Sequence, residues 1–326
     1  MRWLLALPLL TACGTTLGDA SADLNRGFII PYLMADGDVA SACAVGESLG
    51  PMIQSFAGDS RKAARASVLS AVSAAMCMED PIREADLASL REMRAGRYSE
   101  AEDHNQRIKR MHTVAAGRYL DVWDRLAATY GIPEPGAACP KFKNDTDALT
   151  YVMGLSAGLL AVVHDAQGGG GVVPMDIPAG VVRGSTCVDD AQWWGAGAAM
   201  RAAVFVVQPG HPEANDPWAT FASAVASGEA AGVRLTRAFQ VQGAASLGDV
   251  DRIKAFIRED AAHRAAHPAN ERWAMLDTYA LHITMHESDR LWTQLNGYRT
   301  PAGAYGTFPD DAPAALLEFP LLLDLE

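Results

Sequence analysis

The sequence is poor in positive charge. Its 326 residues include 27 lysines and arginines against 39 aspartates and glutamates, which gives a formal net charge of −12. Nucleic-acid phosphates are bound by clustered lysine and arginine side chains, so this balance excludes nucleic acid as a partner. With 49% hydrophobic and 20% charged residues, the chain still has a globular composition and the length for a packed core.

Several common motifs are also missing. The sequence has no phosphate-binding loop, no dinucleotide-binding glycine pattern and no CxxC pair, and we expect no cofactor. Alternating polar and apolar stretches, which are typical of β-strands, are missing too. Instead, apolar residues recur every three or four positions, for example at Ala64, Val68, Leu69, Val72 and Met76. The sequence therefore predicts an all-α fold of helical hairpins, arranged as a solenoid or a bundle.

The N-terminus has the features of an export signal. Arg2 precedes a short apolar run at 4–10, which is far shorter than the roughly 20 residues that span a bilayer. The residues LTAC at 10–13 resemble the lipobox of bacterial lipoproteins. That resemblance implies acylation of Cys13, cleavage before it and, because Gly14 follows, anchoring in the outer membrane of the cell envelope, facing the periplasm. The alternative is an ordinary secretory signal in which Cys13 is incidental.

Export makes the four remaining cysteines candidates for disulfide bonds. If the two predicted helices around residue 60 form an antiparallel hairpin, positions that average near 60 lie side by side, which pairs Cys43 with Cys77. Cys139 and Cys187 each lie in a loop before a helix, and an odd number of helices with a long return connection would bring these loops to one end. We therefore predict a second bond between them. Four buried free thiols are the alternative.

One motif suggests an enzyme. Residues 154–158 read GLSAG, which fits the G-x-S-x-G pattern that presents a nucleophilic serine, here Ser156, between a strand and a helix. That setting needs repeated strands, and the preceding sequence supplies none. A helix over 145–166 explains the small residues differently, because Gly154 and Gly158 would let a neighbouring helix approach closely. We expect no catalytic residue, and a serine hydrolase using Ser156 is the less favoured alternative.

Two pairs of histidines suggest a metal site. His263 with His267, and His282 with His286, are each four residues apart, which places both imidazoles of a pair on one helical face. A zinc site needs one or two further ligands, and the usual ligand spacing does not continue around either pair. We expect partly exposed polar faces at these histidines and no metal.

Four segments together resemble a known family. They are DGDVASACAVGESLGPMIQSF at 36–56, the long run at 97–126, ALTYVMGLSAGLL at 148–160 and WWGAGAAMRAAVFV at 193–206. Behind a lipobox, their order is similar to that of the T component of tripartite ATP-independent periplasmic (TRAP) transporters. The resemblance implies a non-enzymatic, all-α periplasmic lipoprotein with cryptic tetratricopeptide-like helix pairs. It also implies a homotrimer that partners the solute-binding protein of the transporter.

The same resemblance implies a largely apolar passage through each protomer, for a hydrophobic or amphipathic organic solute. We expect aromatic side chains of the central helices to line it, and we name Tyr151, Trp193, Trp194, Phe205 and Trp218. The adjacent pair Trp193 and Trp194 suggests such a passage most. Neighbours on a helix cannot both face the same core direction unless the helix is buried all round or lines a cavity. Ordinary core packing is the alternative for each residue.

The domain organisation follows from these assignments. We predict a signal peptide at 1–12, a lipid-anchored linker at 13–35, one all-α domain at 36–297 and a C-terminal extension at 298–326 that wraps on the surface. The expected function is assistance of solute uptake without catalysis. A structural envelope lipoprotein with the same scaffold and no ligand is the alternative.

Overall fold

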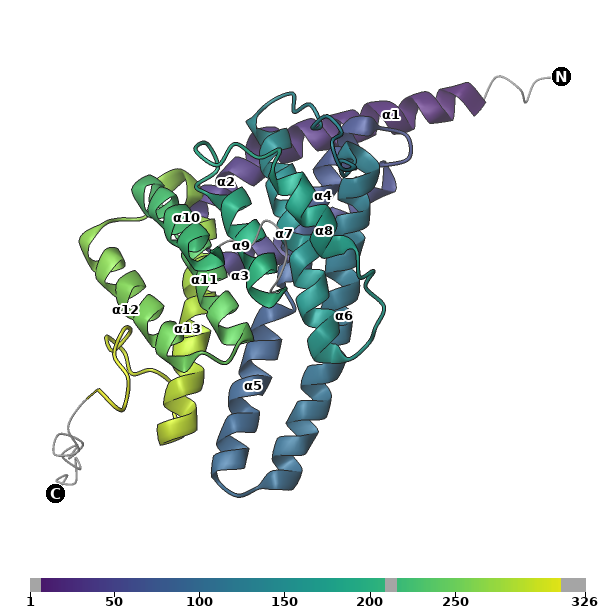
Figure 1. Cartoon of the computed structure of the whole chain (residues 1–326). Helices are drawn as coiled ribbons and strands as arrows, with labels where there is room; N and C mark the ends of the chain where they lie inside the picture. The colour runs from purple at the N-terminus through teal and green to yellow at the C-terminus, as the bar shows by residue number, and fades with distance from the viewer. Residues whose placement is uncertain (1–6, 209–215, 312–326) are drawn as a thin grey trace, which may run out of the picture.

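The computed structural model describes residues 7–208 and 216–311. Every regular element within these two ranges is helical, which confirms the all-α prediction. The helices pack around α7 (Asp145–Gly168), which lies in the middle of the molecule (Figure 1), and its residues 149–158 are all buried. By length and composition α7 could cross a membrane, but its burial among the other helices is that of a core helix.

Glycines bring α7 close to α6 (Tyr98–Tyr130). A Cβ atom at Gly154 would lie 2.7 Å from Leu126 Cδ1, and one at Gly158 would lie 2.5 Å from Trp123 Cε3. Carbon atoms do not approach each other so closely, so only glycine fits at this contact without movement of its neighbours. The predicted role of the small residues of α7 is confirmed.

The first helical hairpin turns near residue 60, as predicted. α3 (Val39–Ser55) begins after Asp38, whose carboxylate accepts two backbone N–H groups of the first turn. α4 (Arg61–Met76) begins after Ser60, whose hydroxyl accepts one backbone N–H group in the same way. Such caps pair amides that the start of a helix otherwise leaves without a partner, and they fix where both helices begin.

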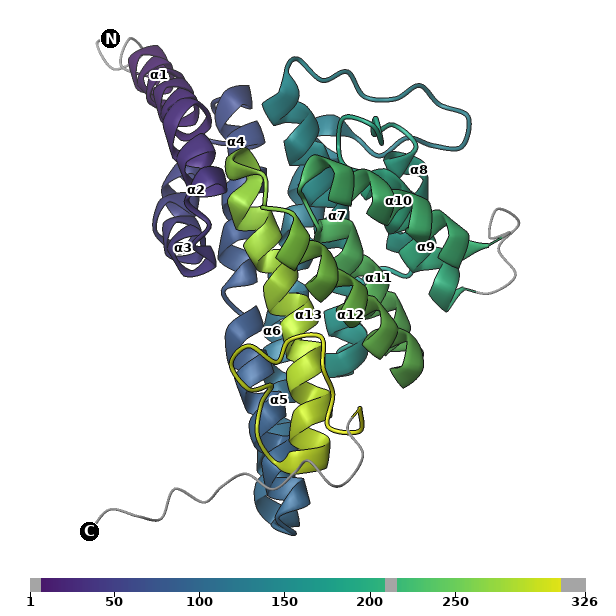
Figure 2. The ribbon, with the colours of Figure 1, turned by 90° about the vertical axis from the view of Figure 1, so that its left-hand side faces the viewer.

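The N-terminal segment, which includes the predicted lipid-anchored linker at 13–35, is helical. α1 (Leu7–Leu24), a π-helical turn (Asn25–Ile29) and α2 (Ile30–Asp36) form one helical rod along the edge of the molecule (Figures 1 and 2). The lipobox resemblance marks where a mature chain would begin, but it carries no information on the fold of the next residues. The rod belongs to the body, because its inner side is buried at Ala22, Asn25, Ile30, Leu33 and Met34.

The hairpin of α5 (Glu79–Arg94) and α6 projects beyond the rest of the molecule (Figure 1). The chain turns at Gly96, whose φ of 74° is a left-handed conformation that glycine adopts without strain. α6 has 33 residues, so it is about 50 Å long.

Helices continue through the second half of the chain. They are α8 (Ile177–Ser185), α9 (Ala196–Val207), α10 (Pro217–Ala231), α11 (Leu235–Ser246), α12 (Val250–Ala266) and α13 (Ala274–Asn296). α13 contacts α2, α5 and α11, and so joins the N-terminal rod and the projecting hairpin to the second half of the molecule (Figure 2).

The described part of the predicted C-terminal extension, 298–311, lies on α12 and α13. The indole N–H of Trp292 donates to the carbonyl of Thr307 at 2.9 Å, and the hydroxyl of Tyr305 donates to the carboxylate of Asp260 at 2.6 Å. Phe308 is buried beside these contacts. The remainder of the predicted extension, 312–326, lies outside the described residues.

Candidate functional site

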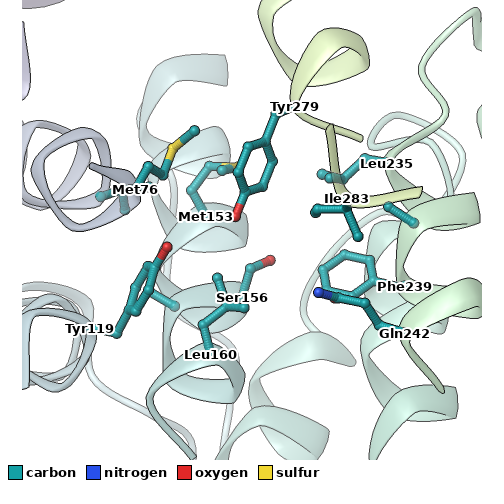
Figure 3. A pocket seen from close by; sticks show the side chains of 13 residues that line it. Met76, Tyr119, Met153, Ser156, Leu160, Leu235, Phe239, Gln242, Tyr279 and Ile283 are labelled. Atoms are coloured by element: carbon teal, nitrogen blue, oxygen red, sulfur yellow. The ribbon is translucent and has the colours of Figure 1, made fainter. Parts of the chain in front are cut away.

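An apolar cavity lies in the centre of the core, between α4, α6, α7, α11 and α13. Figure 3 shows side chains from these helices pointing into it from opposite sides. The lining consists of Val72, Met76, Tyr119, Met153, Ser156, Ala157, Leu160, Leu235, Ala238, Phe239, Gln242, Tyr279 and Ile283.

The cavity is small. It offers about 30 Å³ to water-sized molecules, which is room for about one or two waters. Met76 and Met153 lie in its wall, and methionine side chains repack easily because they have three rotatable bonds. A larger apolar group would enter only after these side chains move.

A polar cleft of about 410 Å³ adjoins the cavity. Leu160, Gln242 and Ile283 line both spaces, so the two meet at these side chains. The volume of the cleft falls in the range of small-molecule sites, roughly 300 to 1,000 Å³. Cavity and cleft together form the candidate ligand site, which is apolar in the core and polar toward its opening.

A chain of hydrogen bonds runs along one wall of the cleft. His164 Nε2 lies 3.0 Å from Glu79 Oε1, and the hydroxyl of Tyr119 donates to the same oxygen at 2.8 Å. His164 Nδ1 lies 2.7 Å from His112 Nδ1. In this contact one of the two nitrogens donates a proton and the other accepts it.

Electrostatics keep Glu79 ionised despite its burial. Burial raises the pKa of a carboxyl group, but the hydrogen bond with His164 and the charge of Arg83 lower the pKa of Glu79 to about 2. For His112, burial and the neighbouring His164 lower the pKa to about 4. At neutral pH the chain therefore has a carboxylate at one end and an uncharged imidazole at the other.

Residues of α5 and α13 form the other wall. Asp86 Oδ2 lies 3.3 Å from His286 Nε2 and 3.0 Å from Arg290 Nε. Although burial opposes the charge, these two partners lower the pKa of Asp86. His286 Nδ1 is buried and has no hydrogen-bond partner among the described residues.

Ser156 lies in the middle of α7 and not at a turn between a strand and a helix. Its hydroxyl donates to the carbonyl of Val152 at 3.1 Å and lies 3.5 Å from Met200 Sδ. Neither partner is a general base of the kind that activates a nucleophilic serine. The G-x-S-x-G pattern therefore occurs here in a setting other than the one that the motif requires.

The five aromatic residues expected to line a passage line neither the cavity nor the cleft. Aromatic lining comes instead from Tyr119, Phe239 and Tyr279. Core and cavity positions follow the same helical period, so the sequence pattern did not separate them. Three of the five pack in the core with other neighbours: Tyr151 with Tyr130 and Phe142, Phe205 with Val182 and Val204, and Trp218 with Phe221 and Phe256.

Trp193 and Trp194 do not lie on a helix, and the prediction that placed them there was wrong. They belong to a turn before α9, and Trp194 has a φ of 58°, which is uncommon for a residue other than glycine. The turn lets both indoles enter the core, where their ring centroids lie 6.1 and 5.0 Å from that of Trp273. Adjacent tryptophans here indicate a turn and not a passage.

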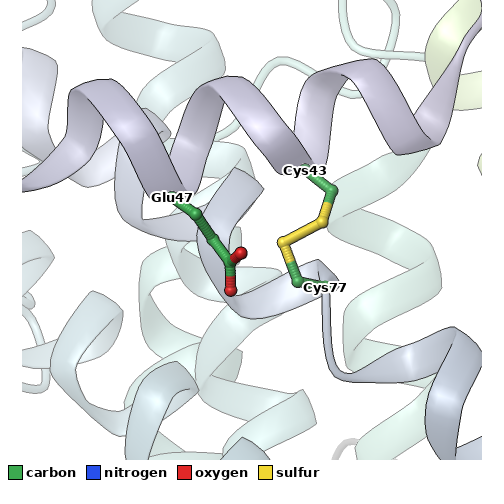
Figure 4. Close-up of side chains that lie close together, drawn as sticks. All are labelled: Cys43, Glu47 and Cys77. Atoms are coloured by element: carbon green, nitrogen blue, oxygen red, sulfur yellow. A yellow bond between two sulfur atoms is a disulfide. The ribbon is translucent and has the colours of Figure 1, made fainter.

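Both predicted disulfides are present. Cys43 is bonded to Cys77 across the α3–α4 hairpin, and Cys139 to Cys187 between the loops that precede α7 and α9. Glu47 lies beside the first bond (Figure 4), and in the described ranges these three residues are the one group whose ligand atoms lie close enough for a metal. Sulfur in a disulfide is not the thiolate that binds metals, so the oxidised group is not a metal site.

The two histidine pairs are packed differently. His263 and His267 stack with their ring centroids 4.4 Å apart near the end of α12. His282 and His286 lie on α13, where His286 lines the cleft. In the part of the chain that the structure describes, neither pair belongs to a group of three or more ligand atoms close enough together for a metal.

No family model, curated protein or solved structure matches the chain.

Sequence reasoning missed the residues of the hydrogen-bonded chain. His164 is separated from His112 by 52 positions and from Glu79 by 85, so only the folded structure brings them together. One signal was present, because a histidine inside the apolar helix that ends at Gly168 needs a buried polar partner. The sequence did not indicate which residue that partner would be.

Proposed function

We propose that the protein is an exported, non-enzymatic lipoprotein that binds a small amphipathic organic solute and assists its uptake. In this proposal it associates with the solute-binding protein of a TRAP-type transporter. One observation carries the ligand: the apolar cavity of Figure 3 adjoins a polar cleft of ligand size. The lipobox before Cys13 and the two disulfides support an extracytoplasmic site. The four family-like segments support the transporter as partner.

The two spaces would take different parts of such a solute. The cleft has the volume for the body of the ligand, with His286 and Arg290 on one wall for hydrogen bonds to its polar groups. The cavity would take a short apolar end once Met76 and Met153 repack. A small ligand is oriented when a few polar groups contact one end of it and apolar side chains bury the other end.

Ligand binding is tested with a pair of neighbouring leucines. Leu160 lines both spaces and Leu159 lines neither, although both are half-buried on α7. We expect native mass spectrometry of protein purified from its own cell envelope to show a bound organic molecule, which Leu160→Trp loses and Leu159→Trp retains. No bound molecule, or equal retention in both variants, would contradict the ligand site.

The transporter association is tested by a pull-down. The mature chain with Cys13→Ser is used as bait in a periplasmic extract of its own organism, and bound proteins are identified by mass spectrometry. We expect recovery of a TRAP-type solute-binding protein. If a well-folded bait recovers none, the structural scaffold becomes the better proposal.

The serine hydrolase is tested separately. Labelling by a fluorophosphonate probe that disappears in Ser156→Ala would support the enzyme. We expect no labelling at Ser156, because its hydroxyl is bonded to its own helix.

A further inference from the structure

The outward face of the N-terminal rod is apolar. We define this outer face as Leu17, Ala20, Leu24, Phe28, Pro31 and Tyr32, which recur at the helical spacing on the side opposite to the buried residues of the rod. The four large side chains are 52% to 71% exposed. A helix on the surface of a globular protein normally turns charged and polar side chains to water. The outer face has no charged side chain, and its only polar group is the hydroxyl of Tyr32.

The charged side chains of the rod point elsewhere. Lys62 of α4 lies 2.8 Å from Asp23 and 3.8 Å from Asp19, and Arg26 lies 3.1 Å from Asp23. Asp19 also accepts a hydrogen bond from the hydroxyl of Ser60 at 2.6 Å. These pairs hold the charges on the flank of the rod next to α4, and the outer face stays uncharged.

The rod is fixed to the body from Gly14 onward. A Cβ atom at Gly14 would lie 2.7 Å from Asp59 Oδ2, and one at Gly18 would lie 2.7 Å from Ser60 Cβ, so α1 contacts the α3–α4 turn directly. α1 is also continuous from Leu7 to Leu24. No flexible segment therefore separates position 13 from the outer face.

We propose that the outer face lies on a phospholipid membrane surface. The inference rests on one part of the proposed function, the acylation of Cys13, whose acyl chains would be held in the same membrane. Leu17 is about one helical turn from Cys13, and Phe28 is about 22 Å along the rod. Since the helix is continuous and fixed to the body, acyl chains at position 13 hold the start of the rod at the interface. Leucine, phenylalanine and tyrosine are residues that interfacial helices place at the lipid boundary.

A second copy of the chain is the competing occupant. Stable protein interfaces take about 20 to 30 residues from each side, whereas the outer face has six. A lipid surface needs no complementary partner and buries a narrow apolar strip as it stands. The size of the face therefore favours lipid.

The test is flotation with vesicles of phosphatidylethanolamine and phosphatidylglycerol. The mature chain carries Cys13→Ser, so that acyl chains do not hold it to the lipid. We expect it to float with the vesicles, and we expect the triple variant Leu24→Ser, Phe28→Ser, Tyr32→Ser to lower the ratio of bound to free protein about tenfold or more. These side chains are exposed, so their loss leaves no cavity, and far-ultraviolet circular dichroism checks the fold.

The matched control removes three apolar side chains that are similarly exposed elsewhere. Val172, Met175 and Leu247 are 57%, 91% and 51% exposed, and replacing all three with serine should leave flotation unchanged. Equal flotation of all three proteins, or of none, would contradict the proposal. A change in oligomeric state with unchanged flotation in the first variant would assign the face to a second copy.

Acylation is measured independently. The intact mass of the wild-type protein from its own membranes shows whether Cys13 carries the diacylglyceryl group. A missing group would contradict the anchor in the proposed function, and the flotation of the lipid-free chain would still decide whether the outer face binds lipid.

Discussion

At Glu79, three side chains from α5, α6 and α7 hold a carboxylate inside the protein. His164 and Tyr119 bond to one oxygen, and Arg83 lies 3.5 Å from the other. Removing one member of such a buried group leaves the others with charge or hydrogen-bonding capacity that water no longer satisfies, and this costs more than the pair contributes when intact. The wall of the cleft therefore depends on this residue.

We expect Glu79→Gln to lower the free energy of unfolding by about 3 kcal/mol, because it removes the charge that faces His164 and Arg83. Urea unfolding at neutral pH measures the change. The matched control is Glu84→Gln on the same helix, where Glu84 forms an exposed pair with Arg299 and the loss should be below about 1 kcal/mol. Equal losses in both variants would contradict the role of Glu79.

Acid should weaken the folded state through two groups. The pKa of His112 is 6.5 when unfolded and about 4 when folded, so between these values the unfolded chain binds more protons and stability falls as the pH is lowered. Glu79, with a folded pKa of about 2 against 4.5, stabilises the fold above pH 4.5, and that contribution is lost as the pH falls toward 2.

His112→Gln isolates the first of these two groups. The free energy of unfolding is obtained from urea titrations between pH 6.5 and pH 4. Its slope against pH should be smaller than that of the wild type by up to about 1.4 kcal/mol per pH unit. A wild-type slope in His112→Gln would show that His112 is not the group that titrates.

At the level of the helices, two glycines show that the effect of alanine on stability depends on packing as well as on intrinsic helix preference. Alanine favours a helix over glycine by about 1 kcal/mol, yet at Gly158 its Cβ would overlap Trp123. At Gly117 on α6, a Cβ atom would meet nothing within 4 Å. The same substitution should therefore have opposite effects at the two positions.

We expect Gly158→Ala to lower the free energy of unfolding by about 1 to 3 kcal/mol, because an overpacked core forces its neighbours to move. Gly117→Ala should raise it by up to about 1 kcal/mol. Thermal unfolding followed by circular dichroism compares the two variants. Stabilisation by Gly158→Ala would mean that Trp123 moves away without cost.

Most helices were predictable because their apolar residues recur at the helical period and their caps are local. Asp38 and Asp216 cap α3 and α10 through contacts within three residues, which a sequence shows directly. The turn at Trp194 was not predictable, because a positive φ at a tryptophan is stabilised by the core around it and not by its neighbours in sequence. The helical rod over 13–35 was hidden by the lipobox, whose motif concerns processing.

At the scale of the whole molecule, two disulfides join segments that are far apart in the sequence. They close loops with sequence separations of 34 and 48 residues. The pairing of Cys43 with Cys77 followed from the symmetry of a hairpin. The candidate site could not be predicted from the sequence. Its residues come from four different helices and meet only after the helices pack: Glu79, His112, His164 and His286.

We expect the double variant Cys139→Ala, Cys187→Ala to lower the free energy of unfolding by about 2 to 4 kcal/mol, since an open loop gains conformational freedom when the chain unfolds. Urea unfolding of the variant, compared with the wild type with and without reductant, measures the loss. In the variant only the Cys43–Cys77 bond is left for the reductant to break. Mass mapping without reductant should show that this bond is still formed. A variant as stable as the oxidised wild type would contradict this expectation.

The projecting α5–α6 hairpin sets how far the protein would reach from lipid in the orientation proposed above. α1 and the tip of this hairpin lie at opposite ends of the molecule (Figure 1), and α6 alone measures about 50 Å. With the outer face of the rod on a membrane, as proposed, the hairpin tip would lie far from the lipid surface. The hairpin would then hold its tip at a fixed distance from the membrane, and a partner could bind the tip without touching the lipid.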